Sequence, residues 1–88
     1  MAADPTKAAL QRLWTELETA LNALLDDLQS TLDAEIIRGS RQYVEHREYG
    51  LALETLYHGT RASKHDLTRE QDAKCQDLAR RMGITLAA

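Results

Sequence analysis

Apolar residues recur through the first third of the chain at the spacing of one face of an α-helix. The members of this stripe are Leu10, Leu13, Trp14, Leu17, Leu21, Leu24, Leu25, Leu28 and Leu32. Separations of three and four residues put side chains on one side of a helix, and such a stripe is ordinarily buried. Asp4 is suited to cap this helix, and Pro5 suits its first position. The pattern predicts a helix over residues 5–29 whose whole stripe faces a core.

Two shorter apolar patterns follow and predict two more helices. The segment 32–46 contains Gly39-Ser40, a pair that weakens a helix and favours a kink. The segment 48–62 leads into a polar loop at 61–66. The residues that we expect to face inward are Leu32, Ile36, Ile37, Tyr43 and Val44 in the first segment, and Tyr49, Ala52, Leu53, Leu56 and Tyr57 in the second.

A fourth helix is predicted up to Met82 by signals at both of its ends. It starts with Thr68-Arg69-Glu70-Gln71, the spelling of a capping box. Gly83 suits a left-handed terminator, and Ile84 can then fold back onto the last turn. The residues expected to face inward are Ala73, Leu78, Ala79 and Met82, with Cys75 at the margin of the core.

The composition agrees with an all-α fold. Of the 88 residues 43% are hydrophobic, phenylalanine is absent and aromatic residues make up 5%. Leucine and alanine must therefore build the core, and both favour helices over strands. Because the predicted connections are short, neighbouring helices should run antiparallel. We expect one domain, residues 1–88, that folds as a small antiparallel bundle of about four helices.

Charge and hydropathy exclude several classes of function. The net charge is −3, whereas neutralising nucleic-acid phosphates needs a surplus of Lys and Arg. No run of 18 apolar residues exists that could span a membrane. The first seven residues lack the layout of a signal peptide. We therefore expect a cytoplasmic protein that binds neither nucleic acid nor membrane.

The reactive side chains form no recognisable catalytic or metal-binding arrangement. His46, His58 and His65 lack the spacing of a metal site, and they fit surface or loop positions. Cys75 is the only cysteine, which excludes an internal disulfide and fits a half-buried structural thiol. The glycines form no phosphate-binding loop. We expect no enzyme, no metal and no cofactor.

Charge is distributed unevenly along the chain. Residues 1–37 carry two basic and seven acidic residues, whereas residues 38–88 carry nine basic and seven acidic ones. Asp26, Asp27, Asp33 and Glu35 gather around the predicted junction of the first two helices. Such a group either simply solubilises the protein or attracts a basic partner, whose association it would accelerate.

Three segments resemble a family of small helical immunity proteins. Val44-Glu45-His46-Arg47-Glu48-Tyr49-Gly50-Leu51-Ala52-Leu53-Glu54-Thr55-Leu56 resembles a segment of the MafI-like group and of relatives in contact-dependent growth inhibition systems. The similarity continues in Leu67-Thr68-Arg69-Glu70 and in Leu78-Ala79-Arg80-Arg81-Met82-Gly83-Ile84. Together these segments span roughly the second half of the chain. Tyr49 and Gly50 have structural roles in this motif.

The resemblance implies a cytoplasmic protein that binds the C-terminal toxin domain of a secreted effector, often a nuclease. Such a protein blocks the active site of the toxin or its substrate surface. Because a nuclease has a basic substrate groove, a surface rich in carboxylates can imitate phosphates. We therefore expect a monomer that contacts the toxin through Asp26, Asp27, Asp33 and Glu35, with Glu45 and Glu48 next.

Two alternatives compete with this hypothesis. The first is a small helical adaptor or regulatory subunit that dimerises through an exposed stripe or binds a partner protein. The second is a helix-turn-helix regulator, which the basic residues of the last third could support. Acidic residues interrupt that basic stretch, however, and the loop before the fourth helix is longer than the ~3–4-residue turn of the motif.

Overall fold

The computed structural model describes residues 5–62 and 67–86, which form four α-helices and no strand. The helices are α1 (Pro5–Leu28), α2 (Ala34–Glu45), α3 (Tyr49–Ala62) and α4 (Arg69–Met82). The all-α bundle expected from the sequence is therefore confirmed. The expected cap at Asp4, the residue His65 and most of the loop 61–66 lie outside the described residues.

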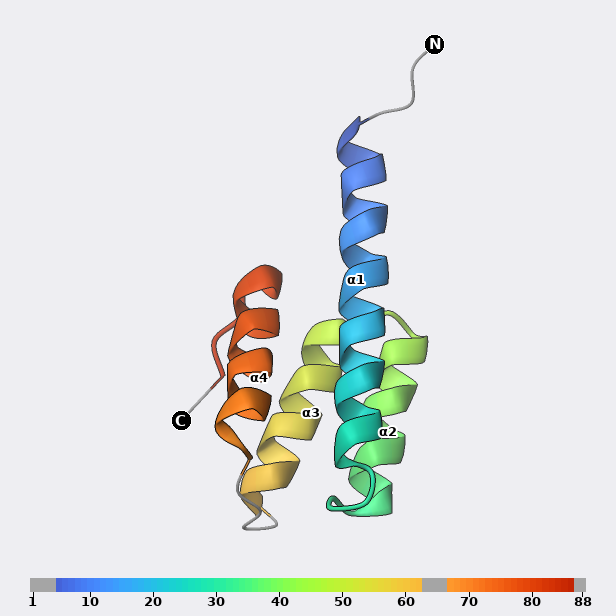
Figure 1. Cartoon of the computed structure of the whole chain (residues 1–88). Coiled ribbons are helices and arrows are strands. Elements are labelled where there is room, and N and C mark those ends of the chain that lie inside the picture. The colour runs from blue at the N-terminus through green and yellow to red at the C-terminus, as the bar shows by residue number, and fades with distance from the viewer. Residues whose placement is uncertain (1–4, 63–66, 87–88) are drawn as a thin grey trace.

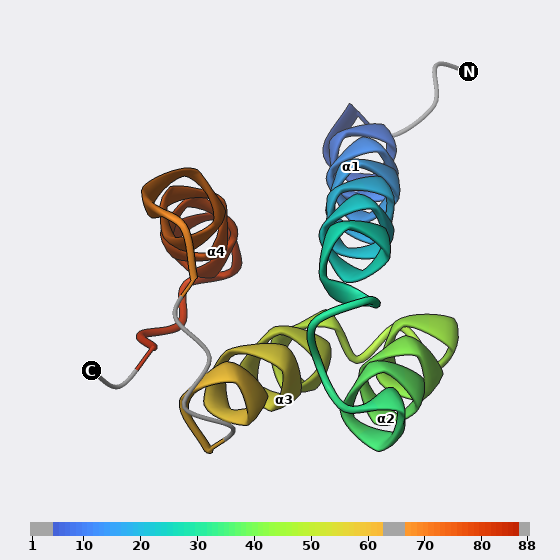
Figure 2. The same ribbon diagram turned by 60° about the horizontal axis from the view of Figure 1, so that its bottom comes forward.

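Successive helices run antiparallel, as their short connections predicted. In Figure 1, α1 descends from the N-terminus, α2 ascends beside it, α3 descends and α4 ascends again. The view along the bundle in Figure 2 places α1 and α4 on one side and α2 and α3 on the other. The N-terminal part of α1 extends beyond the ends of the other three helices (Figure 1).

Leucine side chains from α1, α3 and α4, together with Ile37 and Val44 of α2, form the core. The fully or almost fully buried apolar residues are Leu17, Leu21, Leu24, Leu25, Leu28, Leu32, Ile37, Val44, Tyr49, Ala52, Leu53, Leu56, Cys75, Leu78, Ala79 and Leu86. The stripe of α1 supplies the middle of this core, and each of the other helices covers it with a narrower apolar face. Hydrophobic burial along α1 therefore holds the bundle together.

Three expectations about burial were wrong. Leu10 and Trp14 belong to the α1 stripe, yet each is 42% exposed, because that part of α1 has no helix opposite it. Ala73 is exposed on α4. Cys75 lies inside the core with 0% exposure and is not at its margin. The spacing of apolar residues thus identified the face of each helix but not how far the partner helices reach.

The helix ends follow the local chemistry of the sequence. The second helix begins at Ala34, two residues later than predicted, because the Asp33 carboxylate accepts a hydrogen bond from the Glu35 backbone N–H at 3.0 Å and caps it. The expected capping box of α4 is present between Thr68 and Gln71. Gly83 is left-handed with φ 71°, and the amide of the next residue folds back onto the last turn, as predicted.

The packing of α2 on α3 depends on small residues. The Ser40 hydroxyl is buried and donates a hydrogen bond of 2.8 Å to the carbonyl of Ala52. Gly59 of α3 faces Ile36 of α2 so closely that a Cβ there would lie 2.6 Å from Ile36 Cγ2. The second helix runs through Gly39 and Ser40 without interruption. The Gly-Ser pair, expected to produce a kink, supplies instead the hydroxyl that joins the two helices.

A left-handed arginine forms the corner between α2 and α3. Arg47 has φ 59°, in the region that favours glycine. The next amide, that of Glu48, donates to the Tyr43 carbonyl at 2.8 Å, which closes the end of α2 as Gly83 closes α4. An arginine at this position carries a conformational cost of about 1 kcal/mol that glycine would avoid.

Replacing Gly59 by alanine should destabilise the protein although alanine is the better helix former. The new Cβ would clash with Ile36, a stiff β-branched residue, and we expect a net loss of about 1–2 kcal/mol in the free energy of unfolding. Gly39→Ala is the matched control, because its Cβ would lie 4.0 Å from Thr55 and gains helix propensity without a clash. Urea unfolding followed by circular dichroism measures both; equal stabilities would contradict the close packing.

Stability should fall at alkaline pH partly through Cys75. Burial first, and the charge of Asp72 second, raise the pKa of this thiol from 9.0 to about 11. The unfolded chain therefore loses the proton at a lower pH than the folded one, and the contribution of the neutral thiol to stability disappears between those two values. We expect Cys75→Ala to flatten the decline of stability over that interval, measured as urea midpoints against pH. A parallel decline in both proteins would contradict the assignment.

Candidate protein-binding surfaces

Four carboxylates lie where α1 ends and α2 begins, and we call Asp26, Asp27, Asp33 and Glu35 the acidic end. The Arg41 guanidinium of α2 donates to Asp26 Oδ1 at 2.6 Å. The Gln71 side chain donates to Asp27 Oδ2 at 2.8 Å and so ties the start of α4 to the end of α1. Contacts from two other helices thus hold the two aspartates of α1 in place.

All four side chains of the acidic end are nonetheless exposed. Asp26, Asp27 and Asp33 each accept a hydrogen bond through one carboxylate oxygen, from Arg41, Gln71 and the Glu35 backbone respectively. The second oxygen of each carboxylate faces no described donor. A carboxylate already held in one orientation loses less conformational entropy when a partner binds it. The acidic end is therefore preorganised, although Arg41 offsets part of the charge of Asp26.

The structure does not place the other two expected contact residues at the acidic end. Glu45 lies at the opposite end of α2, about 15 Å along the helix from Glu35. It lines a shallow hollow that runs along α2 past Arg38 and Arg41. Glu48 lies beyond it, in the connection to α3. The six residues therefore form a cluster of four and two separate positions, because α2 is long enough to separate them.

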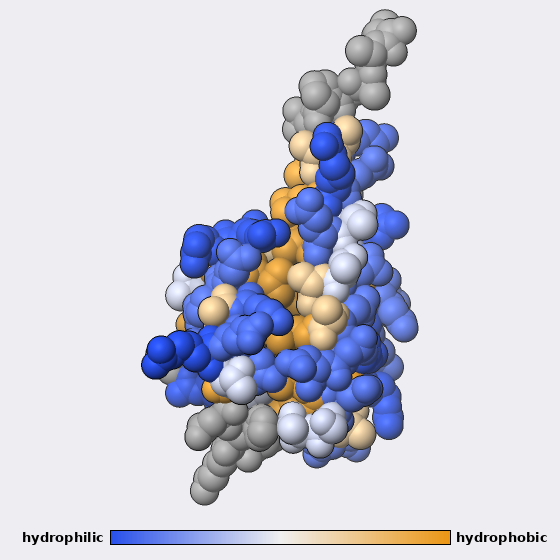
Figure 3. Space-filling model, in the orientation of Figure 1, coloured by the Kyte–Doolittle hydropathy of each residue, from blue (hydrophilic) through white to orange (hydrophobic). Residues whose placement is uncertain are grey.

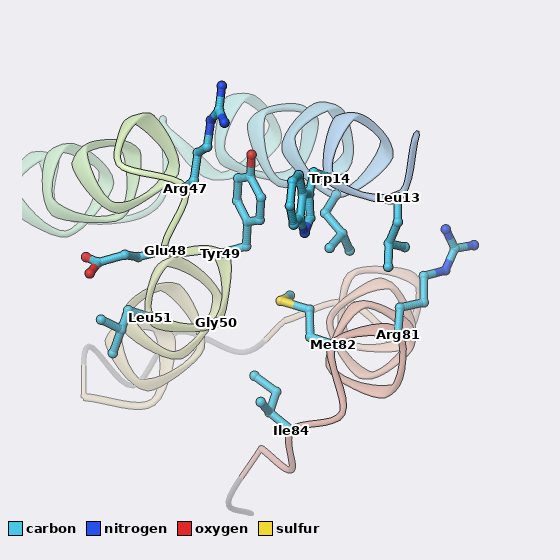
Figure 4. Close-up of a pocket in the computed structure, with 11 residues that line it drawn as sticks. Leu13, Trp14, Arg47, Glu48, Tyr49, Gly50, Leu51, Arg81, Met82 and Ile84 are labelled. Atoms are coloured by element: carbon cyan, nitrogen blue, oxygen red, sulfur yellow. The ribbon is translucent and has the colours of Figure 1, made fainter. Parts of the chain in front are cut away.

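The opposite end of the bundle contains an apolar depression that the sequence did not predict, which we call the end hollow. It has a volume of about 480 Å³. Its lining comes from α1, the α2–α3 connection, the start of α3 and the end of α4: Leu13, Trp14, Leu17, Arg47, Glu48, Tyr49, Gly50, Leu51, Arg81, Met82 and Ile84. Figure 4 shows Trp14, Tyr49, Met82 and Ile84 arranged around it.

The end hollow continues into the exposed part of α1. Leu10 and Trp14 precede its deepest residue, Leu17, on the same stripe of the helix. Figure 3 shows this hydrophobic surface running down the side of α1 that faces α4, with hydrophilic side chains on both sides. A contiguous apolar surface with a polar border is typical of a place where another chain packs.

Polar groups border the end hollow on the side of the α2–α3 corner. The Tyr49 hydroxyl donates to Glu18 Oε2 at 3.4 Å. Burial, followed by the charge of Glu18, raises the pKa of Tyr49 above its usual value of 10.0. The left-handed Arg47 also lies here, and no described acidic group pairs with its guanidinium. A second, more polar hollow of about 320 Å³ adjoins it and shares Trp14, Arg47 and Tyr49.

The part of the chain that the structure describes contains no group of three or more His, Cys, Asp or Glu residues that could hold a metal ion. His46 and His58 are exposed, as expected for surface histidines. None of the described helices combines the length and the apolar character needed to cross a bilayer. The thiol of Cys75 is buried in the core and faces no cavity described above.

Comparisons with models of known protein families, with curated proteins and with solved structures gave no match. The candidate surfaces therefore depend on the chemistry and geometry of this chain alone.

The acidic end could be predicted from the sequence, whereas the end hollow could not. Its members Leu13, Trp14 and Met82 have the spacing of core residues, and spacing does not reveal that the bundle is open at this end. The left-handed conformation of Arg47 gives no signal in the sequence either, since glycine is the residue expected there.

Asp33 combines a structural and a candidate binding role, and two substitutions separate them. Asp33→Asn removes the charge but keeps an oxygen that can cap α2, so the free energy of unfolding should hardly change. Asp33→Ala removes the cap and should cost about 1 kcal/mol. Thermal and urea unfolding measure both variants. Equal stability of the two would show that the hydrogen bond to Glu35 does not stabilise the helix.

Proposed function

We propose that this protein binds the toxin domain of a cognate effector in the bacterial cytoplasm and neutralises it, and that it does so through the acidic end. The proposal combines the resemblance to small immunity proteins with the arrangement of Asp26, Asp27, Asp33 and Glu35. The observation that carries it is that three of these four carboxylates are fixed by hydrogen bonds and remain exposed.

The position of the acidic end supports the proposal further. The resembling segments, 44–56, 67–70 and 78–84, build the α2–α3 corner, the first part of α3 and both ends of α4. The acidic end lies outside all three segments, on α1 and at the start of α2. The segments that resemble the family are thus separate from the surface assigned to the toxin. This separation is expected if the scaffold is common to the family and the toxin-binding surface varies with the partner.

The proposed inhibition is electrostatic and steric. Carboxylates held in fixed positions would occupy places that phosphate groups of a nucleic acid take in a basic groove. The bundle behind them would then exclude the substrate. Charge complementarity would mainly raise the rate of association and the specificity, and contacts around the charges would determine how slowly the complex dissociates.

The exposed stripe on α1 favours a second candidate, an adaptor or regulatory subunit that acts by binding another protein. Leu10 and Trp14 are each 42% exposed on a helix that extends past its own bundle. This candidate needs no toxin and uses the opposite end of the molecule. Rescue from a toxin therefore distinguishes the two candidates.

The test is co-expression with the toxin domain encoded by the neighbouring gene, followed by affinity measurement on the purified pair. We expect this chain to restore growth and to bind the domain. The variant D26N/D27N/E35Q should lower the association rate about tenfold to a thousandfold, because it removes three charges and leaves the cap at Asp33 intact.

The matched control is E16Q/E54Q/D77N, which removes the same number of charges elsewhere on the bundle. It should retain the association rate, apart from the small change that net charge alone produces. The proposed surface is wrong if both variants bind equally well. The proposed function is wrong if the unmodified chain neither binds the domain nor restores growth.

A further inference from the structure

The N-terminal part of α1 is a ridge, residues 7–14, that the rest of the bundle leaves largely uncovered. Near the end of α4, Arg81 reaches Glu16 with a nitrogen–oxygen distance of 3.8 Å, which shows where α4 stops along α1. Beyond Leu13, which still packs against the core, the stripe continues to Leu10 with no helix opposite it (Figure 1). The ridge therefore presents core-type side chains to solvent.

The ridge and the end hollow adjoin each other on one molecule and have opposite shapes. The ridge is convex and carries Leu10, Trp14 lies where the ridge meets the hollow, and the hollow is concave and lined also by Leu17, Met82 and Ile84. A second copy turned by a two-fold axis brings the ridge of each molecule over the hollow of the other. A single two-fold arrangement thus covers the ridge and the hollow of both molecules, as a self-complementary interface requires.

We propose that the occupant of the end hollow is a second copy of this chain, packed antiparallel along α1 to form a two-fold homodimer. With the axis between residues 12 and 13 of α1, Leu10 of each copy lies between Trp14 and Leu17 of the other. The apolar side chains of the two ridges then interleave as they do between antiparallel helices of a bundle. This proposal differs from the monomer expected from the sequence.

Charge complementarity supports a second copy as the occupant. Lys7 and Glu18 are eleven residues apart, about three helical turns, and so lie on the same flank of the stripe. In an antiparallel pair with the axis between residues 12 and 13, Lys7 of each copy is level with Glu18 of the other. Lys7 is exposed and has no ion pair among the described residues. Arg12 is exposed, and Arg47 and Arg81 at the border of the hollow offset part of the attraction for Lys7.

The dimer goes beyond the proposed function and uses a different surface. The acidic end is at the opposite end of the bundle, so dimerisation leaves both copies of it accessible. Dimer formation is measured on the chain alone, without any toxin, and its failure is therefore independent of the failure of toxin binding. A variant that cannot dimerise is expected to keep its acidic end intact.

Light scattering on the full chain, from about 1 μM to about 1 mM, tests the proposal directly. We expect the mass to approach twice the 9.9 kDa of one chain as the concentration rises. Trp14 is the only tryptophan and lies in the proposed interface. Its fluorescence should shift to shorter wavelength over the same concentrations. A mass of one chain throughout would overturn the proposal.

Leu10→Glu should raise the dimer dissociation constant about a hundredfold or more, because the substitution acts twice across a two-fold interface. The residue is exposed in the single chain, so the fold should be unaffected. Ala73→Glu is the matched control, because Ala73 is exposed on α4 and is not among the residues that line the end hollow. The control should dimerise normally. An undiminished dimer of Leu10→Glu would overturn the proposal.

A charge exchange tests the antiparallel arrangement itself. Lys7→Glu and Glu18→Lys should each weaken the dimer about tenfold at low salt, since each places like charges opposite each other twice. The double variant K7E/E18K should restore the dimer, because the pair is re-formed in reverse. A dimer that both single variants weaken and the double variant does not restore would contradict the proposed two-fold axis.

Discussion

The burial of one leucine stripe on α1 is the interaction on which the rest of the structure depends. Leu21, Leu25 and Leu28 are completely buried and contact the inner faces of the other helices. Because hydrophobic burial is the dominant favourable term in folding, the length over which α1 is covered determines where the bundle ends.

The two ends of the bundle differ in how the other helices cover α1. At the C-terminal end of α1, side chains form polar contacts: Gln71 donates to Asp27, Arg41 donates to Asp26, and Asp33 caps α2. Carboxylates are thereby fixed on the surface instead of moving freely. At the other end, the N-terminal part of α1 extends beyond the last residue of α4. The apolar stripe of α1 is therefore exposed there and forms the ridge beside the end hollow. The molecule thus has one end suited to a charged partner and one suited to an apolar partner.

Much of the fold could be predicted because it depends on local signals. The helices α1 to α4, the capping box at Thr68 and the terminator at Gly83 were all found from spacing and from residue types at helix ends. The α2 start was misplaced by two residues, since the pattern includes Leu32, which is buried in the connection before the helix. A buried residue just outside a helix can continue the three-to-four-residue spacing of the helix, so the sequence alone does not distinguish it from a helical residue.

The sequence by itself determined the all-α class, the antiparallel order of the helices and the acidic junction, because helix propensity, capping and short loops act over a few residues. Only the tertiary structure decided that Cys75 is in the core and that Trp14 is not. These outcomes depend on where α4 and the α2–α3 corner end relative to α1. That relative position arises from packing between distant segments, such as Gly59 against Ile36, and no local pattern encodes it.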